Sequence, residues 1–303
     1  MRTKRAKSKF SIFETIVFIF MLYVVIVTLY PFLNVLAISL NDSNDTVKGG
    51  IYLWPRAFTL QNYITIFTTS NLNLGHAAFV SVARTVIGTV TSVISCTMLA
   101  FTLSREDYVF RKPITIFFVI TMYVSGGMIP SYLLIKDLHL IGNFWVYIIP
   151  GLVSFFNVII VRSFIESLPM SIQESARIDG ANDFVIFYKI IIPLCLPVIA
   201  TISLWIAVGQ WGAWFDTYLY GNGKEAMSTL QFSLMKLLDN TSAASGQSSS
   251  LINKNGSAAI VNTVSPQSIK MAITIVVTVP ILMVYPFVQK YFVTGVTLGA
   301  VKG

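Results

Sequence analysis

The sequence has little charge and few of the side chains that perform chemistry. Only 11% of its 303 residues are charged, whereas a typical soluble domain is about a quarter charged. Its two cysteines, Cys96 and Cys195, both lie in apolar runs, which argues against a disulfide framework. Together with a hydrophobic fraction of 55%, these deficits exclude a soluble enzyme, a disordered chain and a disulfide-stabilised secreted module.

Groups for catalysis or metal binding are equally scarce. The two histidines, His76 and His139, are remote from any cluster of carboxylates, and no Cys/His zinc spacing or Gly-x-Ser-x-Gly motif is present. Residues 221–224 (Gly-Asn-Gly-Lys) come nearest to a phosphate-binding loop, but Glu225 stands where a Walker A motif requires Ser or Thr. The sequence therefore predicts neither catalytic residues nor a metal site, and the chain is not expected to be an enzyme.

Long apolar stretches are what the chain has instead. A helix needs about 20 residues to cross the hydrocarbon core of a bilayer, and six stretches qualify. Their approximate bounds are 12–40, 77–103, 114–135, 143–165, 190–212 and 271–293. The sequence therefore predicts an all-α integral membrane protein with six transmembrane helices. Interruptions or kinks are expected at Gly126-Gly127 with Pro130, at Pro150-Gly151, and at Pro193 with Pro197.

The net charge of +8 would suggest nucleic-acid binding in a soluble protein, but here its placement indicates orientation. If the N-terminus is cytoplasmic, 13 of the 21 lysines and arginines fall in short cytoplasmic segments, and seven fall in the longer outer loops. The positive-inside rule then puts both termini in the cytoplasm. We therefore expect a multi-pass protein of the cytoplasmic membrane that binds no nucleic acid.

A short helix is predicted in the loop at 166–189, between the fourth and fifth spans. Ser171 and Glu174 have the spacing of a capping box directly after Pro169, so a helix is expected to begin there. Gly180 is placed to end it in a left-handed conformation. Such a helix is too short to be stable in isolation. It either docks against a partner or simply joins two spans, and these residues alone do not decide between the two.

The same loop resembles the EAA motif of ABC importer permeases. The residues that carry the resemblance are Glu174-Ser175-Ala176, then Asp179-Gly180-Ala181, then Phe187, Ile190, Pro193 and Pro197. Ser175 replaces the second residue of the motif, and Ile192 stands where Leu usually precedes the proline. The resemblance covers about 77–290, the five-helix unit of type I (MetI-like) permease domains, with one additional N-terminal helix. Overall the chain is similar to the MalG-like carbohydrate-uptake permeases. The Met128–Tyr132 segment and the Ser-rich outer loop resemble the LplC-like and alginate-type permeases for complex oligosaccharides.

This resemblance implies that the chain works as one subunit of a transporter made of several proteins. The chain would form half of a saccharide pathway, together with a second permease subunit that is a different chain. An extracytoplasmic solute-binding protein would deliver the saccharide, and a dimer of separate ATP-binding subunits would hold ATP and Mg²⁺, so this chain would need no cofactor. The short helix would be the coupling helix, with Glu174 as polar contact, Gly180 permitting close approach, and Ala176 and Ala181 keeping the docking face thin.

By the same resemblance, residues 1–76 form the N-terminal tail, first helix and outer loop, 77–293 the permease domain, and 294–303 a cytoplasmic tail. Polar residues inside or at the ends of spans are candidates for the substrate path: Arg84, Asn157, Gln210 and Asp216, with Trp205, Trp211 and Trp214 as faces for sugar rings. Arg84 could instead extend to the outer interface, and each tryptophan could belong to an ordinary aromatic belt. The alternatives to an ABC importer are a secondary carrier or channel without an ATPase, and a membrane-embedded enzyme.

Overall fold

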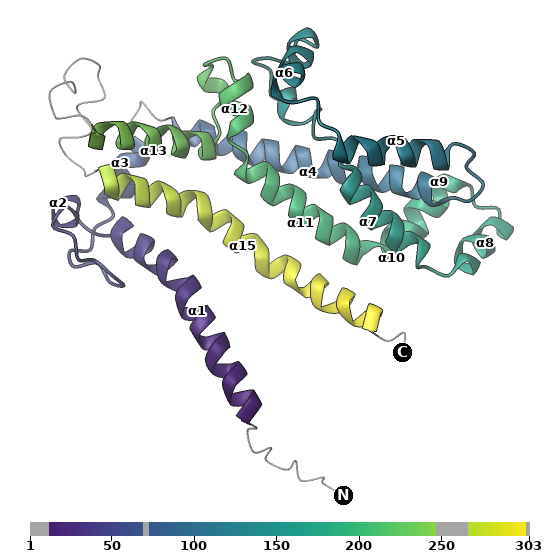
Figure 1. Cartoon of the computed structure of the whole chain (residues 1–303), viewed down its shortest axis with the longest axis horizontal. Helices are drawn as coiled ribbons and strands as arrows, with labels where there is room; N and C mark the ends of the chain where they lie inside the picture. The colour runs from purple at the N-terminus through teal and green to yellow at the C-terminus, as the bar shows by residue number, and fades with distance from the viewer. Residues whose placement is uncertain (1–11, 69–72, 247–265, 301–303) are drawn as a thin grey trace, which may run out of the picture. The chain divides into compact units, whose positions relative to one another are not determined.

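A computed structural model describes residues 12–68, 73–246 and 266–300 (Figure 1). Within these ranges the regular elements are helices, and the only strand pairing is an isolated bridge between Asn41 and Phe58, so the all-α prediction is confirmed. The basic N-terminal residues and the last three residues lie outside the described ranges. The chain divides into two compact units, residues 1–71 with 238–276 and residues 72–237 with 277–303, and each is considered by itself.

The first unit begins with α1 (Ile12–Ser39), a 28-residue apolar helix. Its side chains are exposed along most of its length and become buried only at Ala37, Ile38 and Ser39. A helix this long and apolar can cross a membrane unbroken. It confirms a helix over 12–40, and its exposed apolar surface is compatible with lipid rather than water as its solvent.

A hydrogen-bonded loop follows α1 in the same unit. It contains α2 (Ser43–Thr46), whose N-cap Asp42 accepts from two backbone N–H groups, and α3 (Gln61–Thr68). The fully buried Asn41 amide donates to Asp45 Oδ2 and Thr46 Oγ1, and its oxygen accepts from the Ala57 N–H. The hydrogen bond from Asn41, and secondarily the one from Arg56, lower the pKa of the Asp45 carboxyl below its usual value.

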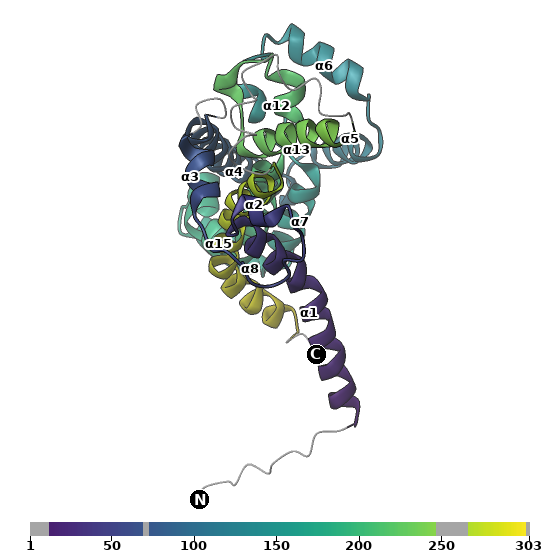
Figure 2. The same cartoon turned by 90° about the vertical axis from the view of Figure 1, so that its left-hand side faces the viewer.

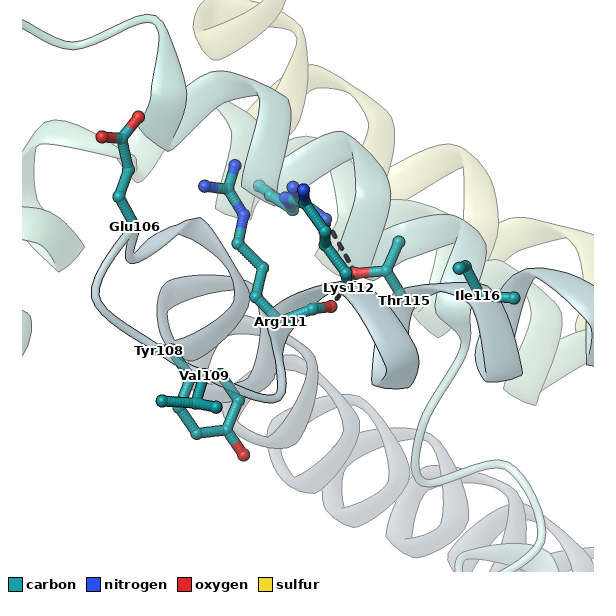
Figure 3. Close-up of a pocket in the computed structure, with 8 residues that line it drawn as sticks. Glu106, Tyr108, Val109, Arg111, Lys112, Thr115 and Ile116 are labelled. Atoms are coloured by element: carbon teal, nitrogen blue, oxygen red, sulfur yellow. Dashed lines mark hydrogen bonds between the residues drawn. The ribbon is translucent and has the colours of Figure 1, made fainter.

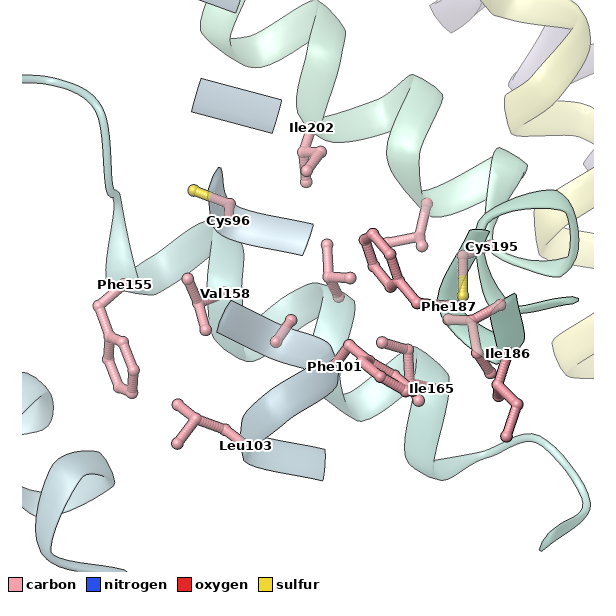
Figure 4. Close-up of a cluster of buried hydrophobic side chains, with 14 of the residues drawn as sticks. Cys96, Phe101, Leu103, Phe155, Val158, Ile165, Ile186, Phe187, Cys195 and Ile202 are labelled. Carbon is pink, nitrogen blue, oxygen red and sulfur yellow. The ribbon is translucent and has the colours of Figure 1, made fainter. Parts of the chain in front are cut away.

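The second unit is built on α4 (Leu74–Ser104), an unbroken 31-residue helix. Helices α11 (Leu196–Gly212) and α7 (Phe155–Glu166) pack along it (Figure 1). Figure 4 shows the apolar core between them, in which Cys96, Val158 and Ile202 are fully buried. In a bilayer the alternative surroundings of these side chains are lipid and not water, so close van der Waals packing holds α4, α7 and α11 together as the centre of this unit.

Three predicted spans are interrupted, and each break has a residue that explains it. The span expected at 114–135 is two helices, α5 (Arg111–Tyr123) and α6 (Met128–Asp137), bent by 119° around Gly126-Gly127. Gly127 adopts a φ of +86°, which favours glycine. The span expected at 143–165 is a 3₁₀ turn, η1 (Phe144–Tyr147), followed by α7, with Pro150-Gly151 between them.

The span expected at 190–212 is also not straight. Its first part comprises α9 (Asp183–Ile186), the π-helical η2 (Phe187–Ile191) and α10 (Ile192–Leu194), and it is bent by 80° relative to α11. Pro193 and Pro197 flank the bend, and proline removes a helical hydrogen bond and clashes with the preceding turn. Thus two described helices, α1 and α4, could cross a membrane unbroken. Up to five spans result by length and composition if each bent pair of helices counts as one span, the pairs being α5 with α6, α7 with the helix at Met170–Ile178, and α9–α10 with α11.

Five further helical elements lie within the described residues. They are α8 (Met170–Ile178), α12 (Phe215–Tyr220), η3 (Glu225–Met227), α13 (Leu230–Gly246) and α15 (Pro266–Ala300). Helix α15 contains the sixth predicted span, 271–293. Helices α6 and α12 lie near each other above α4 in both views (Figures 1 and 2), and the rings of Tyr132 and Tyr220 stack with centroids 6.1 Å apart.

Candidate functional site

The predicted loop helix is present as α8, but it begins differently from the expectation. Pro169 is its N-cap residue and the helix starts at Met170, so Ser171 lies within the first turn and the predicted capping box is wrong. The proline ring fixes φ at −59° and leaves ψ extended at 127°, which places the start of the helix immediately after it. The predicted end is confirmed: Gly180 has a φ of +82°, and the Ala181 N–H donates to the Ala176 carbonyl at 2.9 Å.

Helix α8 has an exposed side and a buried side. Glu174, Ser175, Asp179 and Gly180 are exposed. Ala176 is buried in the apolar core, and Ala181 packs partly buried against that core. The two alanines therefore let α8 approach its own chain closely, and they do not form part of the exposed face as expected.

An ion-pair cluster that sequence reasoning missed attaches α8 to the end of α4. Arg105, directly after α4 and only 8% exposed, donates to Gln173 Oε1 at 2.7 Å and pairs with Asp183. Arg177 on α8 lies 3.2 Å from Asp107 Oδ2 and 3.7 Å from Asp183 Oδ1. Hydrogen bonds to charged groups are worth about 1.5–3 kcal/mol, so these contacts fix the orientation of α8 relative to the long helix.

Arg84 lies near the other end of α4 and is 2% exposed, so it does not extend to an interface. Its guanidinium pairs with Asp216, donates to Gln210 Oε1 at 2.8 Å and to the Ala213 carbonyl at 3.1 Å, and lies 4.5 Å from the centre of the Tyr147 ring. A buried charge is tolerated only with such a complete set of partners. The cluster joins α4 to the junction of α11 and α12.

Gln210 occupies its place because Gly88 leaves room for it. A Cβ atom at position 88 would lie 2.9 Å from the Gln210 amide, a distance that real Cβ contacts do not reach. The same amide donates to the Tyr147 carbonyl at 3.3 Å. The Tyr147 hydroxyl in turn donates to the Met227 carbonyl at 2.7 Å and lies 3.1 Å from Thr217 Oγ1. Hydrogen bonds through Tyr147 to Met227 and Thr217 therefore fix the position of Gln210 beside Arg84.

This cluster lines a cavity of about 400 Å³. Its polar wall includes Arg84, Gln210 and Asp216, whose side chain is 39% exposed. Tyr147 and Tyr220 supply rings, and burial together with the Asp216 carboxylate raises the pKa of the Tyr220 hydroxyl, so Tyr220 stays neutral. Hydroxyl-rich ligands are bound by such combinations of charged groups, amides and aromatic faces.

The other predicted path residues do not line this cavity. Asn157 is buried in α7. Trp205 is exposed and stacks on Phe156 with centroids 6.0 Å apart. Trp211 is buried and donates to the Val277 carbonyl at 2.9 Å, while Trp214 packs beside the Phe215 and Tyr218 rings. Of the seven candidates, Arg84, Gln210 and Asp216 meet. The sequence missed Tyr147 and Tyr220, although the break at Pro150-Gly151 indicated the region.

Comparison with known proteins gives a consistent set of relatives. Residues 77–298 match the model of the family described as "Binding-protein-dependent transport system inner membrane component". The chain is 39% identical to the polygalacturonan/rhamnogalacturonan transport system permease protein YtcP of Bacillus subtilis (strain 168), over 97% of this chain and 100% of that protein. It is 35% identical to protein LplC of the same strain, over 91% and 90% of the two chains.

A solved structure is similar over nearly the whole chain. It is a crystal structure of a bacterial ABC transporter involved in the import of the acidic polysaccharide alginate. One of its chains superimposes with a TM-score of 0.83 and is 28% identical, with 94% of this chain and 100% of that chain covered. The bent helices and the short α8 thus belong to an arrangement that a transporter subunit adopts.

Proposed function

Because this chain belongs to the family of binding-protein-dependent transport system inner membrane components, we propose that it is the permease subunit of an ATP-driven importer for an oligosaccharide. The observation that carries the proposal is α8, which exposes Glu174 on one side and is attached to α4 through Arg105 on the other. A short exposed helix fastened to a long span can pass the movement of an attached protein into the membrane.

In this proposal α8 inserts into a separate ATP-binding subunit. Glu174, Ser175 and Asp179 contact that subunit, and Gly180 permits the sharp exit of the chain. ATP and Mg²⁺ bind to the ATP-binding dimer and not to this chain. A second permease, a different chain, completes the pathway, and an extracytoplasmic solute-binding protein delivers the saccharide. The distribution of lysine and arginine supports an orientation with both termini in the cytoplasm.

The cavity at Arg84 is the proposed contact site for the saccharide. The relatives named for polygalacturonan/rhamnogalacturonan and alginate support a sugar that carries carboxylates. Arg84 would attract a uronate carboxylate, Asp216 and Gln210 would bond hydroxyls, and the Tyr220 ring would pack against a sugar face. Since Arg84 is already paired with Asp216, a uronate must compete with Asp216 for the guanidinium, and this favours modest affinity and ready release.

The test is reconstitution of the complete transporter in liposomes: this chain, its companion permease, the ATP-binding subunit and the binding protein. Oligogalacturonides should stimulate ATP hydrolysis and enter the liposomes only when ATP hydrolysis is possible. Arg84→Gln should lower uptake at least tenfold, whereas Lys48→Gln, an exposed residue of the outer loop, should not. Uptake without ATP hydrolysis would instead indicate a secondary carrier or channel, and a failure of every saccharide to stimulate hydrolysis would overturn the substrate assignment.

A further inference from the structure

A second cavity, of about 570 Å³, lies apart from the Arg84 cavity and next to the ion-pair cluster of α8, because its lining residue Glu106 stands between Arg105 and Asp107 in the chain. It is formed by the connection between α4 and α5, the first turns of α5, and α7 (Figure 3). Its lining residues are Glu106, Tyr108, Val109, Arg111, Lys112, Thr115, Ile116 and Arg162. The cavity thus combines three cations with an apolar wall, which is an amphiphilic surface.

The two arginines are held in place by a single shared carboxylate. Glu166 Oε1 accepts from Arg111 at 2.7 Å and from Arg162 at 2.9 Å, and Arg162 also donates to Thr115 Oγ1 at 3.1 Å. Their side chains are 25% and 18% exposed, and both have further N–H donors at the cavity. Because the two side chains are already held in place, binding an anion would cost little additional side-chain entropy. The site is therefore preorganised for an anion.

The local charge is not balanced within the chain. Three cations, Arg111, Lys112 and Arg162, stand against the two carboxylates Glu106 and Glu166, which leaves one positive charge. The Lys112 side chain is exposed and has no hydrogen bond or ion pair in the part of the chain that the structure describes. One monoanion, such as a phosphodiester, would neutralise the cluster.

The start of α5 adds to this imbalance. Arg111 and Lys112 occupy its first turn, which contains no acidic residue, and Phe110 at the N-cap provides no side-chain hydrogen bond. Cations at the positive end of a helix are unfavourable, and an anion there is favourable. Figure 3 shows the Arg111 and Lys112 side chains rising on the same side of this turn, so a single anion can be reached by both.

The apolar wall indicates what the anion is attached to. Val109 is 85% exposed and Ile116 is 60% exposed, and exposed apolar surface of this kind is unfavourable in water. Both residues flank the entry to a predicted span, where acyl chains of lipid are the available apolar partner. A free phosphate would leave this surface uncovered, whereas a phospholipid covers it and neutralises the charge together.

We propose that this cavity binds an anionic phospholipid, with the phosphodiester between Arg111, Lys112 and Arg162 and the acyl chains along Val109 and Ile116. Basic cavities at the boundary of membrane-spanning helices are suited to anionic head groups. The proposal depends on the membrane location of the family and does not depend on the identity of the transported saccharide, so the two can fail separately.

The test measures lipid retention by native mass spectrometry of the purified full chain. The probes are phosphatidylglycerol, phosphatidylcholine with the same acyl chains, and the soluble head group glycerophosphoglycerol. Wild-type protein should retain phosphatidylglycerol at least about fivefold more tightly than phosphatidylcholine, and Lys112→Gln should remove about a fivefold factor. Lys112 is exposed and unpaired, so this variant should fold; Arg162→Gln provides the second variant. Lys189→Gln, an exposed lysine elsewhere on the predicted cytoplasmic side, is the matched control.

Each alternative has its own result. Equal retention of the two lipids, or unchanged retention in both Lys112→Gln and Arg162→Gln, would overturn the proposal. Tight binding of glycerophosphoglycerol alone would show a soluble anion as the ligand and would also overturn it. Displacement of phosphatidylglycerol when the ATP-binding subunit assembles would assign the cavity to a protein interface, which is a third way to refute it.

Discussion

Replacing Gly88 with alanine tests whether the packing of α4 against α11 sets the position of Gln210. The added methyl group would lie 2.9 Å from the Gln210 amide. That amide is fixed between the Arg84 guanidinium and the Tyr147 carbonyl. Since it cannot keep both hydrogen bonds and avoid the methyl group, Gly88→Ala should expel it from the cluster.

The magnitude follows from these contacts. Losing the hydrogen bond to the charged Arg84 costs about 1.5–3 kcal/mol, and losing the one to Tyr147 costs about 0.5–1.5 kcal/mol. Alanine in a helix interior recovers about 1 kcal/mol relative to glycine. Gly88→Ala should therefore destabilise the chain by about 1–3.5 kcal/mol, although glycine-to-alanine changes in helices are ordinarily stabilising.

The assay is thermal unfolding of the purified chain in detergent, followed by tryptophan fluorescence. A loss of this size lowers the midpoint by at least about 2 °C. Gly75→Ala is the matched control, because Gly75 lies in the same helix with open space around it, and it should not lower the midpoint. In a Gln210→Ala background the penalty of Gly88→Ala should disappear. An equal penalty with and without Gln210 would refute the reasoning.

Three further substitutions address the other contacts. Arg105→Gln should reduce copurification with the ATP-binding subunit about tenfold, because α8 loses a charge-assisted hydrogen bond worth about 1.5–3 kcal/mol. Unchanged copurification and uptake would contradict the role of Arg105 in attaching α8 to α4. Gly180→Val forces a β-branched residue into a φ of +82°, at a cost of about 1–2 kcal/mol, and should lower assembly and uptake about 5- to 30-fold, while Gly75→Val should not. Unchanged assembly and uptake in Gly180→Val would exclude α8 as the coupling helix. The lowered pKa of Asp45 stabilises the loop that follows α1 at pH values above the unfolded pKa of about 3.9, and this contribution is lost as the pH falls through the lower folded value. The protection factors of the loop amides, which divide out the intrinsic pH dependence of hydrogen exchange, should therefore fall below about pH 4 in the wild type and stay nearly constant in Asp45→Asn. An equal fall in both proteins would contradict the assignment.

Local patterns predicted the parts of the fold that local forces determine. The long apolar runs predicted α1 and α4, and the glycine and proline pairs predicted where other spans are interrupted. Gly180 predicted the end of α8, because a left-handed residue is a local requirement. The resemblance to sugar-uptake permeases, drawn from the loop around Glu174, is confirmed by the family match and the relatives.

The long-range contacts could not be predicted, because no local signal encodes them. Arg84 and Asp216 are 132 residues apart, and Arg105 and Asp183 are 78 residues apart. Composition showed that Arg84 was unusual within a span, but it did not indicate a carboxylate beyond the end of α11 as its partner. Likewise, the bend angles depend on how the separate pieces pack, and hydropathy carries no information about them. The roles of the site residues and the proposed domain bounds stay predictions.

The buried arginines near the two ends of α4, Arg84 within the helix and Arg105 directly after it, have a mechanical consequence. Arg84 and Arg105 are 21 residues apart, which is about 31 Å along the axis and about 60° around it. Their acidic partners, Asp216 and Asp183, flank the segment that contains α11. With both ends fastened, a relative displacement of about 1 Å at one end corresponds to a rotation of only about 2° between the two segments. Helix α4 and residues 183–216, including the bend at Pro193 and Pro197, should therefore move as one rigid body. The larger rearrangements of a transport cycle must then occur at the other two interruptions, at Gly126-Gly127 and at Pro150-Gly151.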